Sequence, residues 1–152
     1  MLSSIKNNKF MNVEESSSGL QKRSEINEKY KWDLSDIYKS DIEWENTFDI
    51  LKVKSEKFKT FMGTLGKSAS NLLKCLKFDE EIGIDLDRLH LYAMLAKDID
   101  LSNEKYQGMY DRLMILASKI SAESSFIKPE ILAINEAKLK GFINEDNDLK
   151  VY

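Results

Sequence analysis

The chain has 152 residues, of which 42% are hydrophobic and 32% charged, so it is long enough for one globular domain with a buried core. Its 23 Lys and Arg residues are outnumbered by 26 Asp and Glu residues, giving a net charge of −3, and no apolar run reaches the length of a membrane span. We therefore expect neither a nucleic-acid partner nor a membrane.

Residues 1–29 are rich in Asn, Ser, Lys and Glu and show no sustained hydrophobic period, which predicts a flexible N-terminal arm. Closely spaced aromatic residues begin at residue 30 and include Trp32 and Tyr38. We therefore expect a helical domain over residues 30–152.

The first predicted helix opens at Ser40 and Glu43, which form a capping box. Its apolar stripe, interrupted only by Ser55, consists of Trp44, Phe48, Leu51, Phe58, Met62 and Leu65. Gly63 and Gly66 can adopt the left-handed conformation that ends a helix. The Lys- and Glu-rich run Lys52–Lys57 predicts a solvated helix surface.

A second helix is predicted after Ser68, a suitable N-cap residue. Its apolar positions are Leu72, Leu76, Ile82, Leu86, Leu89, Ala93 and Ala96. Asp79, Glu80 and Gly83 weaken its middle, so one long helix and two abutting helices both fit the pattern.

The third helix is predicted to start at Ser102 and Glu104, as N-cap and first-turn acid. Its apolar positions include Tyr106, Met109, Tyr110, Leu113, Leu116 and Ile120. Pro129 forces a break or starts a short turn, and a last helix follows over about residues 135–143. The fold class is therefore all-α: an antiparallel bundle of about three long helices plus a short C-terminal helix.

The inventory of reactive side chains is small, with one cysteine, Cys75, and one histidine, His90. An H-E-x-x-H zinc site needs two histidines, so no zinc site and no catalytic residue are assigned to this chain. A Cys–His dyad fails if one helix holds both residues, because 15 positions span about 22 Å. A lone cysteine and the lack of a signal-peptide run together favour a cytoplasmic location.

Three tyrosines, Tyr92, Tyr106 and Tyr110, cluster around the turn between the second and third helices. Tyrosine suits peptide- or partner-facing surfaces because it is both apolar and hydrogen-bonding. The competing interpretation is that the three rings form the amphipathic edge of the core.

Several segments are similar to a known family. The segment Lys31–Tyr38, followed by Trp44 and Glu45, resembles the opening of oligoendopeptidase F, a zinc metallopeptidase family related to thimet oligopeptidase. Further resemblances follow in the same order at Leu65–Leu73, Leu91–Asp100, Tyr106–Gln107 and Phe126–Leu132. Together they run from about Tyr30 to Tyr152.

In that family the resembling region is an N-terminal helical part that helps to wall a deep channel, and the zinc site lies in a C-terminal domain. The resemblance implies that this chain is the channel-framing portion of a zinc endopeptidase of short peptides, cut short before its partner, the catalytic domain. It would be inactive alone, with zinc and oligopeptides bound only in the full-length context. The alternative is a stand-alone helical module that binds a peptide or a protein, as the remnant of a truncated peptidase.

Overall fold

The computed structural model describes Asn27, residues 32–99, Leu101 and residues 103–152. The predicted flexible arm, residues 1–29, lies outside the described residues except for Asn27. The residues from Trp32 to Tyr152 form one compact unit.

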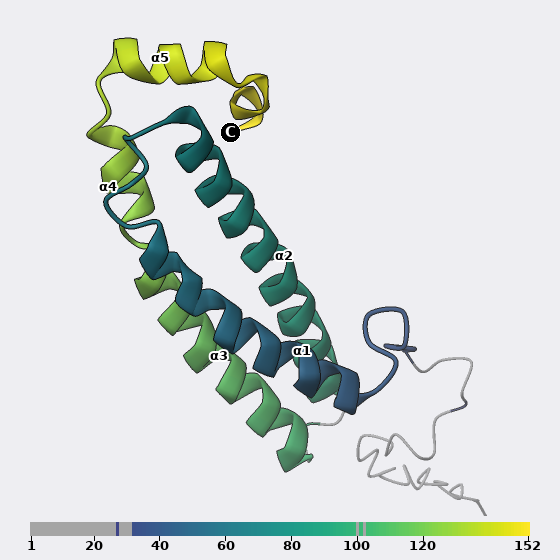
Figure 1. Ribbon diagram of the computed structural model, residues 1–152. Helices are drawn as coiled ribbons and strands as arrows, with labels where there is room; N and C mark the ends of the chain where they lie inside the picture. The colour runs from purple at the N-terminus through teal and green to yellow at the C-terminus, as the bar shows by residue number, and fades with distance from the viewer. Residues whose placement is uncertain (1–26, 28–31, 100, 102) are drawn as a thin grey trace, which may run out of the picture. The chain divides into compact units, whose positions relative to one another are not determined.

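This unit is built from helices in the order α1 (Asp41–Lys54), η3 (Ser55–Thr60), α2 (Ala69–Ile99), α3 (Glu104–Ser124), α4 (Ile127–Leu132), α5 (Glu136–Glu145) and η4 (Asn147–Val151). The described residues contain no strand, so the all-α prediction is confirmed. Helix α2 runs antiparallel to both α1 and α3, and α5 with η4 lies across the beginning of α2 (Figure 1). Within the described residues, no helix has both the length and the apolar character that a membrane crossing requires.

The start of α1 follows the predicted capping box with one difference. The Ser40 hydroxyl accepts the Glu43 N–H at 3.3 Å, as expected. The Glu43 carboxylate accepts the N–H of Lys39 at 2.7 Å rather than that of Ser40. The helix therefore receives both hydrogen bonds of a capping box, with the second bond shifted by one residue.

The end of the first helix differs from the prediction. α1 stops at Lys54 and tightens into the 3-10 helix η3, so the helical part of the apolar stripe ends at Phe58. Met62 is 56% exposed, whereas Leu65 is buried in the core as predicted, although it lies beyond the helix. Gly63 takes the predicted left-handed conformation, with φ of +72°. Gly66 does not, because the chain has already turned at Gly63.

Helix α2 is one continuous helix of 31 residues, which settles the alternative left open by Gly83. The Ser68 hydroxyl accepts the Asn71 N–H at 3.2 Å, in agreement with its predicted role as N-cap. The N-cap of α3 is Asn103, whose side chain accepts the Lys105 N–H at 3.1 Å. The predicted cap, Ser102, lies outside the described residues.

The core lies where α1, α2 and α3 meet. Trp44 is fully buried there, and its indole N–H donates to the Leu89 carbonyl of α2 at 2.9 Å. Ser55 is buried in the same stripe, and its hydroxyl donates to the Lys52 carbonyl, so this hydroxyl is not left unpaired. Pro129 sits in the first turn of α4, where its missing N–H costs no helical hydrogen bond.

Candidate functional site

The two reactive side chains of the sequence do not form a catalytic pair. Cys75 and His90 both lie on the continuous helix α2, about 22 Å apart along its axis. Cys75 is fully buried, and this burial raises the pKa of its thiol to about 11, with Asp79 and Glu130 adding to the shift. Cys75 is therefore a small core residue rather than an activated nucleophile.

The described residues also offer no metal centre. Nowhere among them do three His, Cys, Asp or Glu side chains gather in a way that could hold a metal ion. The zinc ion that the family resemblance implies therefore does not fit the side chains that the structure describes.

The structure places Tyr92 inside the bundle. Its side chain is 7% exposed, and its ring packs edge-to-face against Tyr38 with centroids 5.6 Å apart. The Tyr92 hydroxyl donates to Asp41 at 2.6 Å, and Lys105 donates to the other oxygen of that carboxylate at 2.6 Å. Tyr92 thus ties the beginnings of α1 and α3 to the end of α2.

Electrostatics in this cluster follow from the same contacts. Burial and the adjacent Asp41 carboxylate raise the pKa of Tyr92 well above its usual range, so its hydroxyl remains protonated and donates. Burial alone would raise the pKa of Asp41, but hydrogen bonds from Lys105 and Tyr92 outweigh it and lower that pKa. Asp41 is therefore held as the anion.

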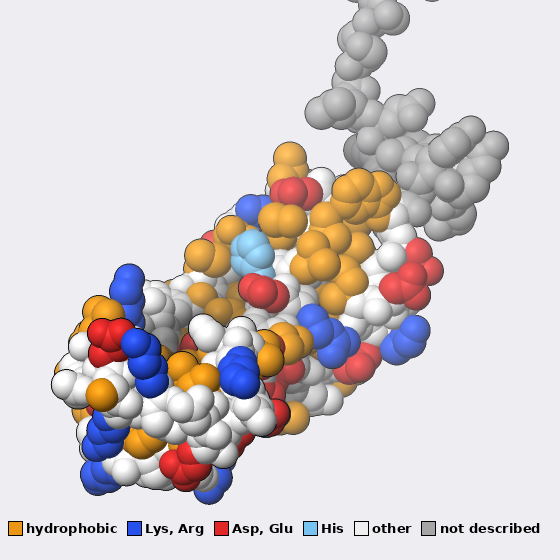
Figure 2. Space-filling model, turned by 90° about the horizontal axis from the view of Figure 1, so that it is seen from above, with side chains coloured by type: hydrophobic (Ala, Val, Ile, Leu, Met, Phe, Trp, Pro, Cys, Tyr) orange, Lys and Arg blue, Asp and Glu red, His pale blue; other side chains and the backbone are white. Residues whose placement is uncertain are grey.

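Tyr110 lies half-buried at the surface shared by α2 and α3. Lys97 places its ammonium 4.0 Å from the Tyr110 ring centroid, and the His90 ring lies 5.6 Å away. Leu91, next to His90, and Met114, one turn beyond Tyr110, are both exposed. Figure 2 shows hydrophobic side chains on either side of the histidine on this face.

Tyr106 is also half-buried, packed against the core at the first turn of α3, with Lys105 5.9 Å from its ring centroid. The three tyrosines therefore do not form one continuous surface. Tyr92 belongs to the interior, whereas Tyr106 and Tyr110 each expose part of a ring beside a lysine.

The segment that precedes α1 is held by contacts that sequence analysis did not predict. Arg88 of α2 donates to the Ile37 carbonyl at 3.0 Å, and its guanidinium lies 5.2 Å from the Tyr38 ring centroid. These contacts join residues about 50 positions apart, so no local spacing pattern announces them. Tyr38 of this segment is therefore part of the core, whereas Trp32 is 63% exposed.

The described side chains can therefore bind but offer no assembled means of catalysis. Partly exposed aromatic rings, lysines and aliphatic side chains suit a protein or peptide surface. A nucleophile within hydrogen-bond reach of a base, the minimum for covalent catalysis, is not found among Cys75, His90 and their described neighbours.

Comparison with known proteins identifies relatives of the chain. No protein-family model matches it. It is 34% identical over 142 residues to "Oligopeptidase PepF" of Bacillus subtilis, covering 93% of this chain and 21% of that protein. It is 32% identical over 130 residues to "Group B oligopeptidase PepB" of Streptococcus agalactiae, covering 86% of this chain and 22% of that protein.

A solved structure agrees with these relatives. The crystal structure of oligoendopeptidase-F from Enterococcus faecium matches 74% of this chain and 22% of that chain, with a TM-score of 0.68 and 30% sequence identity. The chain thus spans about a fifth of the length of the proteins it matches. Sequence and fold together show that this chain is homologous to the N-terminal region of oligoendopeptidase F.

Proposed function

We propose that this chain is the channel-framing N-terminal portion of an oligoendopeptidase F-like zinc endopeptidase that cleaves short peptides. The observation that carries the proposal is the match to the Enterococcus faecium oligoendopeptidase-F structure, at 30% identity over 74% of this chain but only 22% of that one. In this proposal the family domain comprises residues 30–152, and the protein is cytoplasmic.

The catalytic zinc and its ligands would lie in the C-terminal domain, outside this chain. The described residues supply no cluster of potential metal ligands, which is consistent with that division. This chain would narrow the channel and contact the peptide, without taking part in bond cleavage.

Tyr106 and Tyr110 are the side chains that we propose to face the peptide or the partner domain. Each is half-buried and lies beside a lysine, so each can offer a ring face and a hydroxyl to a ligand. Tyr92 would act from behind them by holding the α2–α3 end of the bundle through Asp41.

The exposed side of α1 mixes apolar and polar side chains. Ile42 is 73%, Ile50 63% and Val53 71% exposed, and the other exposed residues of the helix are Glu43, Asn46, Asp49 and Lys52. In this proposal further protein covers the three aliphatic side chains.

A stand-alone module that binds a peptide or a protein is the second candidate, because the same exposed aliphatic side chains would suit a partner surface. The two candidates separate on the intact mass of the product in its native host, measured by mass spectrometry after capture with an antibody against residues 40–126. A product far heavier than 17.6 kDa supports the peptidase. A product of about that mass, with no heavier species, contradicts it and favours the module.

A further inference from the structure

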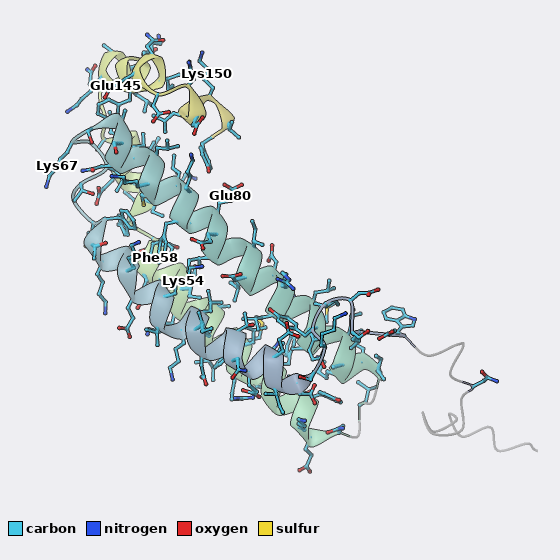
Figure 3. All side chains as sticks on the ribbon, turned by 45° about the vertical axis from the view of Figure 1, so that its right-hand side comes forward. Lys54, Phe58, Lys67, Glu80, Glu145 and Lys150 are labelled. Atoms are coloured by element: carbon cyan, nitrogen blue, oxygen red, sulfur yellow. The ribbon has the colours of Figure 1, made fainter. Side chains whose placement is uncertain are left out.

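A groove between η3 and α2 combines lysines with an aromatic floor. It has a volume of about 330 Å³ and is lined by Lys57, Thr60, Phe61, Lys74, Lys77, Phe78 and Glu81. Figure 3 shows Lys54 and Phe58, just beside it, between the first helix and α2, with Glu80 on the opposite side of α2. This volume lies at the lower end of the range for ligand pockets.

The floor of the groove is formed by rings from both walls. Phe61 and Phe78 lie with their centroids 5.5 Å apart at an interplanar angle of 38°, and Phe58 meets Phe78 from beneath at 4.9 Å. Lys57 reaches across the groove, with its ammonium 5.3 Å from the Phe78 centroid. Phe58 is fully buried and Phe78 is 6% exposed, so an apolar ligand group would meet mainly the half-buried Phe61 ring and only a small part of Phe78, with the lysines around it.

The charge of the groove is opposite in sign to that of the whole chain. Three lysines and one glutamate line it, whereas the chain carries a net charge of −3. Lys54 engages that glutamate, Glu81, at 2.8 Å, and also holds Asp85 at 3.0 Å. The Glu81 carboxylate is thus already paired with Lys54, which does not line the groove.

The lysines themselves are largely available. Lys57 and Lys74 form no ion pair with any residue that the structure describes. Lys77 pairs with Asp148 at 2.7 Å, but both side chains are more than half exposed, so this pair contributes little stability and can be replaced by another carboxylate.

We propose that this groove binds an acidic peptide segment carrying an apolar side chain. Ammonium groups on both walls would pair with the carboxylates, and the apolar side chain would lie against Phe61 and Phe78. A small inorganic anion could meet the lysines but would leave the aromatic floor uncovered. The inference concerns a binding surface only and does not depend on peptidase activity.

The test uses the full chain and an acetylated, amidated tetrapeptide, Glu-Glu-Phe-Glu, titrated while amide chemical shifts are recorded by NMR. We expect shifts at Lys57, Phe61 and Phe78, and weaker binding at higher salt because exposed charges are screened. The double variant Lys57→Gln/Lys74→Gln should bind about tenfold more weakly, as expected for the loss of two exposed charge contacts. Circular dichroism checks that the variant retains its helices.

The matched control is Lys39→Gln/Lys128→Gln, which removes the same charge from two exposed positions that do not line the groove. It should bind like the unmodified chain, and Gln-Gln-Phe-Gln should bind weakly or not at all. Equal losses in both double variants would overturn the proposal, since the attraction would then be non-specific. Tighter binding of a single-stranded oligonucleotide to the same residues would also overturn it.

Discussion

At the scale of single residues, Asp41 joins the three long helices at one end of the bundle. It lies in the first turn of α1, accepts from Tyr92 of α2 and pairs with Lys105 of α3. Its pKa is lowered by those hydrogen bonds against the opposing effect of burial. A carboxyl group whose pKa is lowered by folding stabilises the folded state at pH values above its unfolded pKa of 3.8. This contribution is lost as the pH falls through the pKa of the folded state.

We therefore predict that Asp41→Asn lowers the free energy of unfolding by about 1 kcal/mol at pH 7 and by less at pH 2, because the ionised fraction of the wild-type carboxyl group falls with the pH. Urea denaturation of both proteins at each pH measures the difference. The exposed Asp36→Asn is the control and should have little effect at either pH. An Asp41→Asn difference that stays constant between pH 7 and pH 2 would contradict this linkage.

Cys75 provides a second residue-scale prediction. The thiol is buried and its pKa is raised to about 11, so it should react with a disulfide reagent at pH 8 far more slowly in the native chain than in urea. The variant Ser118→Cys adds an exposed thiol on α3, and one fast-reacting group per chain is expected from it. Rapid labelling of the unmodified native chain would show that Cys75 is accessible, against the structure.

At the scale of elements, two glycines have opposite roles. Gly83 lies in the interior of α2, and a Cβ atom placed there meets nothing within 4 Å. Gly63, by contrast, has φ of +72°, a backbone conformation that side chains with a Cβ atom disfavour.

We predict that Gly83→Ala stabilises the chain by about 0.5–1 kcal/mol, because alanine has the higher helix propensity. Gly63→Ala should destabilise it by about 1–2 kcal/mol. Thermal or urea unfolding of both variants and of the unmodified chain measures the sign of each change in stability. Two changes of the same sign would mean that one of these backbone conformations has been assigned incorrectly.

The turn after η3 depends on a side chain from a distant element. The Glu130 carboxylate of α4 accepts the N–H of Gly63 and, at 3.4 Å, the N–H of Leu65. It thereby satisfies backbone donors that no helix supplies with acceptors and holds the turn that follows η3.

Glu130→Ala should therefore cost about 1–2 kcal/mol in urea denaturation, and Glu130→Gln less, because the amide retains one acceptor oxygen. Glu136→Gln serves as the control, since Glu136 is exposed and pairs only with its helical neighbour Lys140. The account of this turn fails if Glu130→Ala and Glu136→Gln are equally stable.

The elements that sequence analysis predicted well are those defined by local contacts. The Ser40 and Ser68 hydroxyls accept a backbone N–H three residues on, and the Asn135 side chain accepts the N–H of Ala137, two residues on, so short spacing patterns reveal these helix starts. The turn that leaves Met62 exposed could not be predicted in this way, because Glu130, which holds the Gly63 N–H, lies 67 residues away.

The same distinction applies to the candidate sites. The three tyrosines are close in sequence: Tyr92, Tyr106 and Tyr110. Tyr92 nevertheless lies in the core, because its position on α2 faces inward and its hydroxyl donates to Asp41. The run Lys52–Lys57 predicts a solvated helix surface, but the groove beside Lys57 cannot be predicted from that run, because its second wall comes from α2 and its rings from both elements. Surfaces shared by two elements are visible only once the packing is known.

At the scale of the whole molecule, the chain corresponds to about a fifth of the length of its relatives, and its described residues hold no cluster of potential metal ligands. Three exposed aliphatic side chains of α1 and the half-buried Tyr106 and Tyr110 are available for contact with further protein. We therefore propose that this chain shapes a peptidase whose chemistry resides elsewhere.

A chimera tests that claim most directly: the region of Bacillus subtilis PepF that matches this chain is replaced by residues 32–152, and cleavage of a fluorogenic oligopeptide is measured. The chimera should cleave the peptide. Two controls, tested separately, should not: the isolated chain with added zinc, and PepF lacking the matching region. A chimera that is folded and contains zinc but is inactive would contradict the claim. So would an isolated chain that binds one zinc ion and cleaves the peptide.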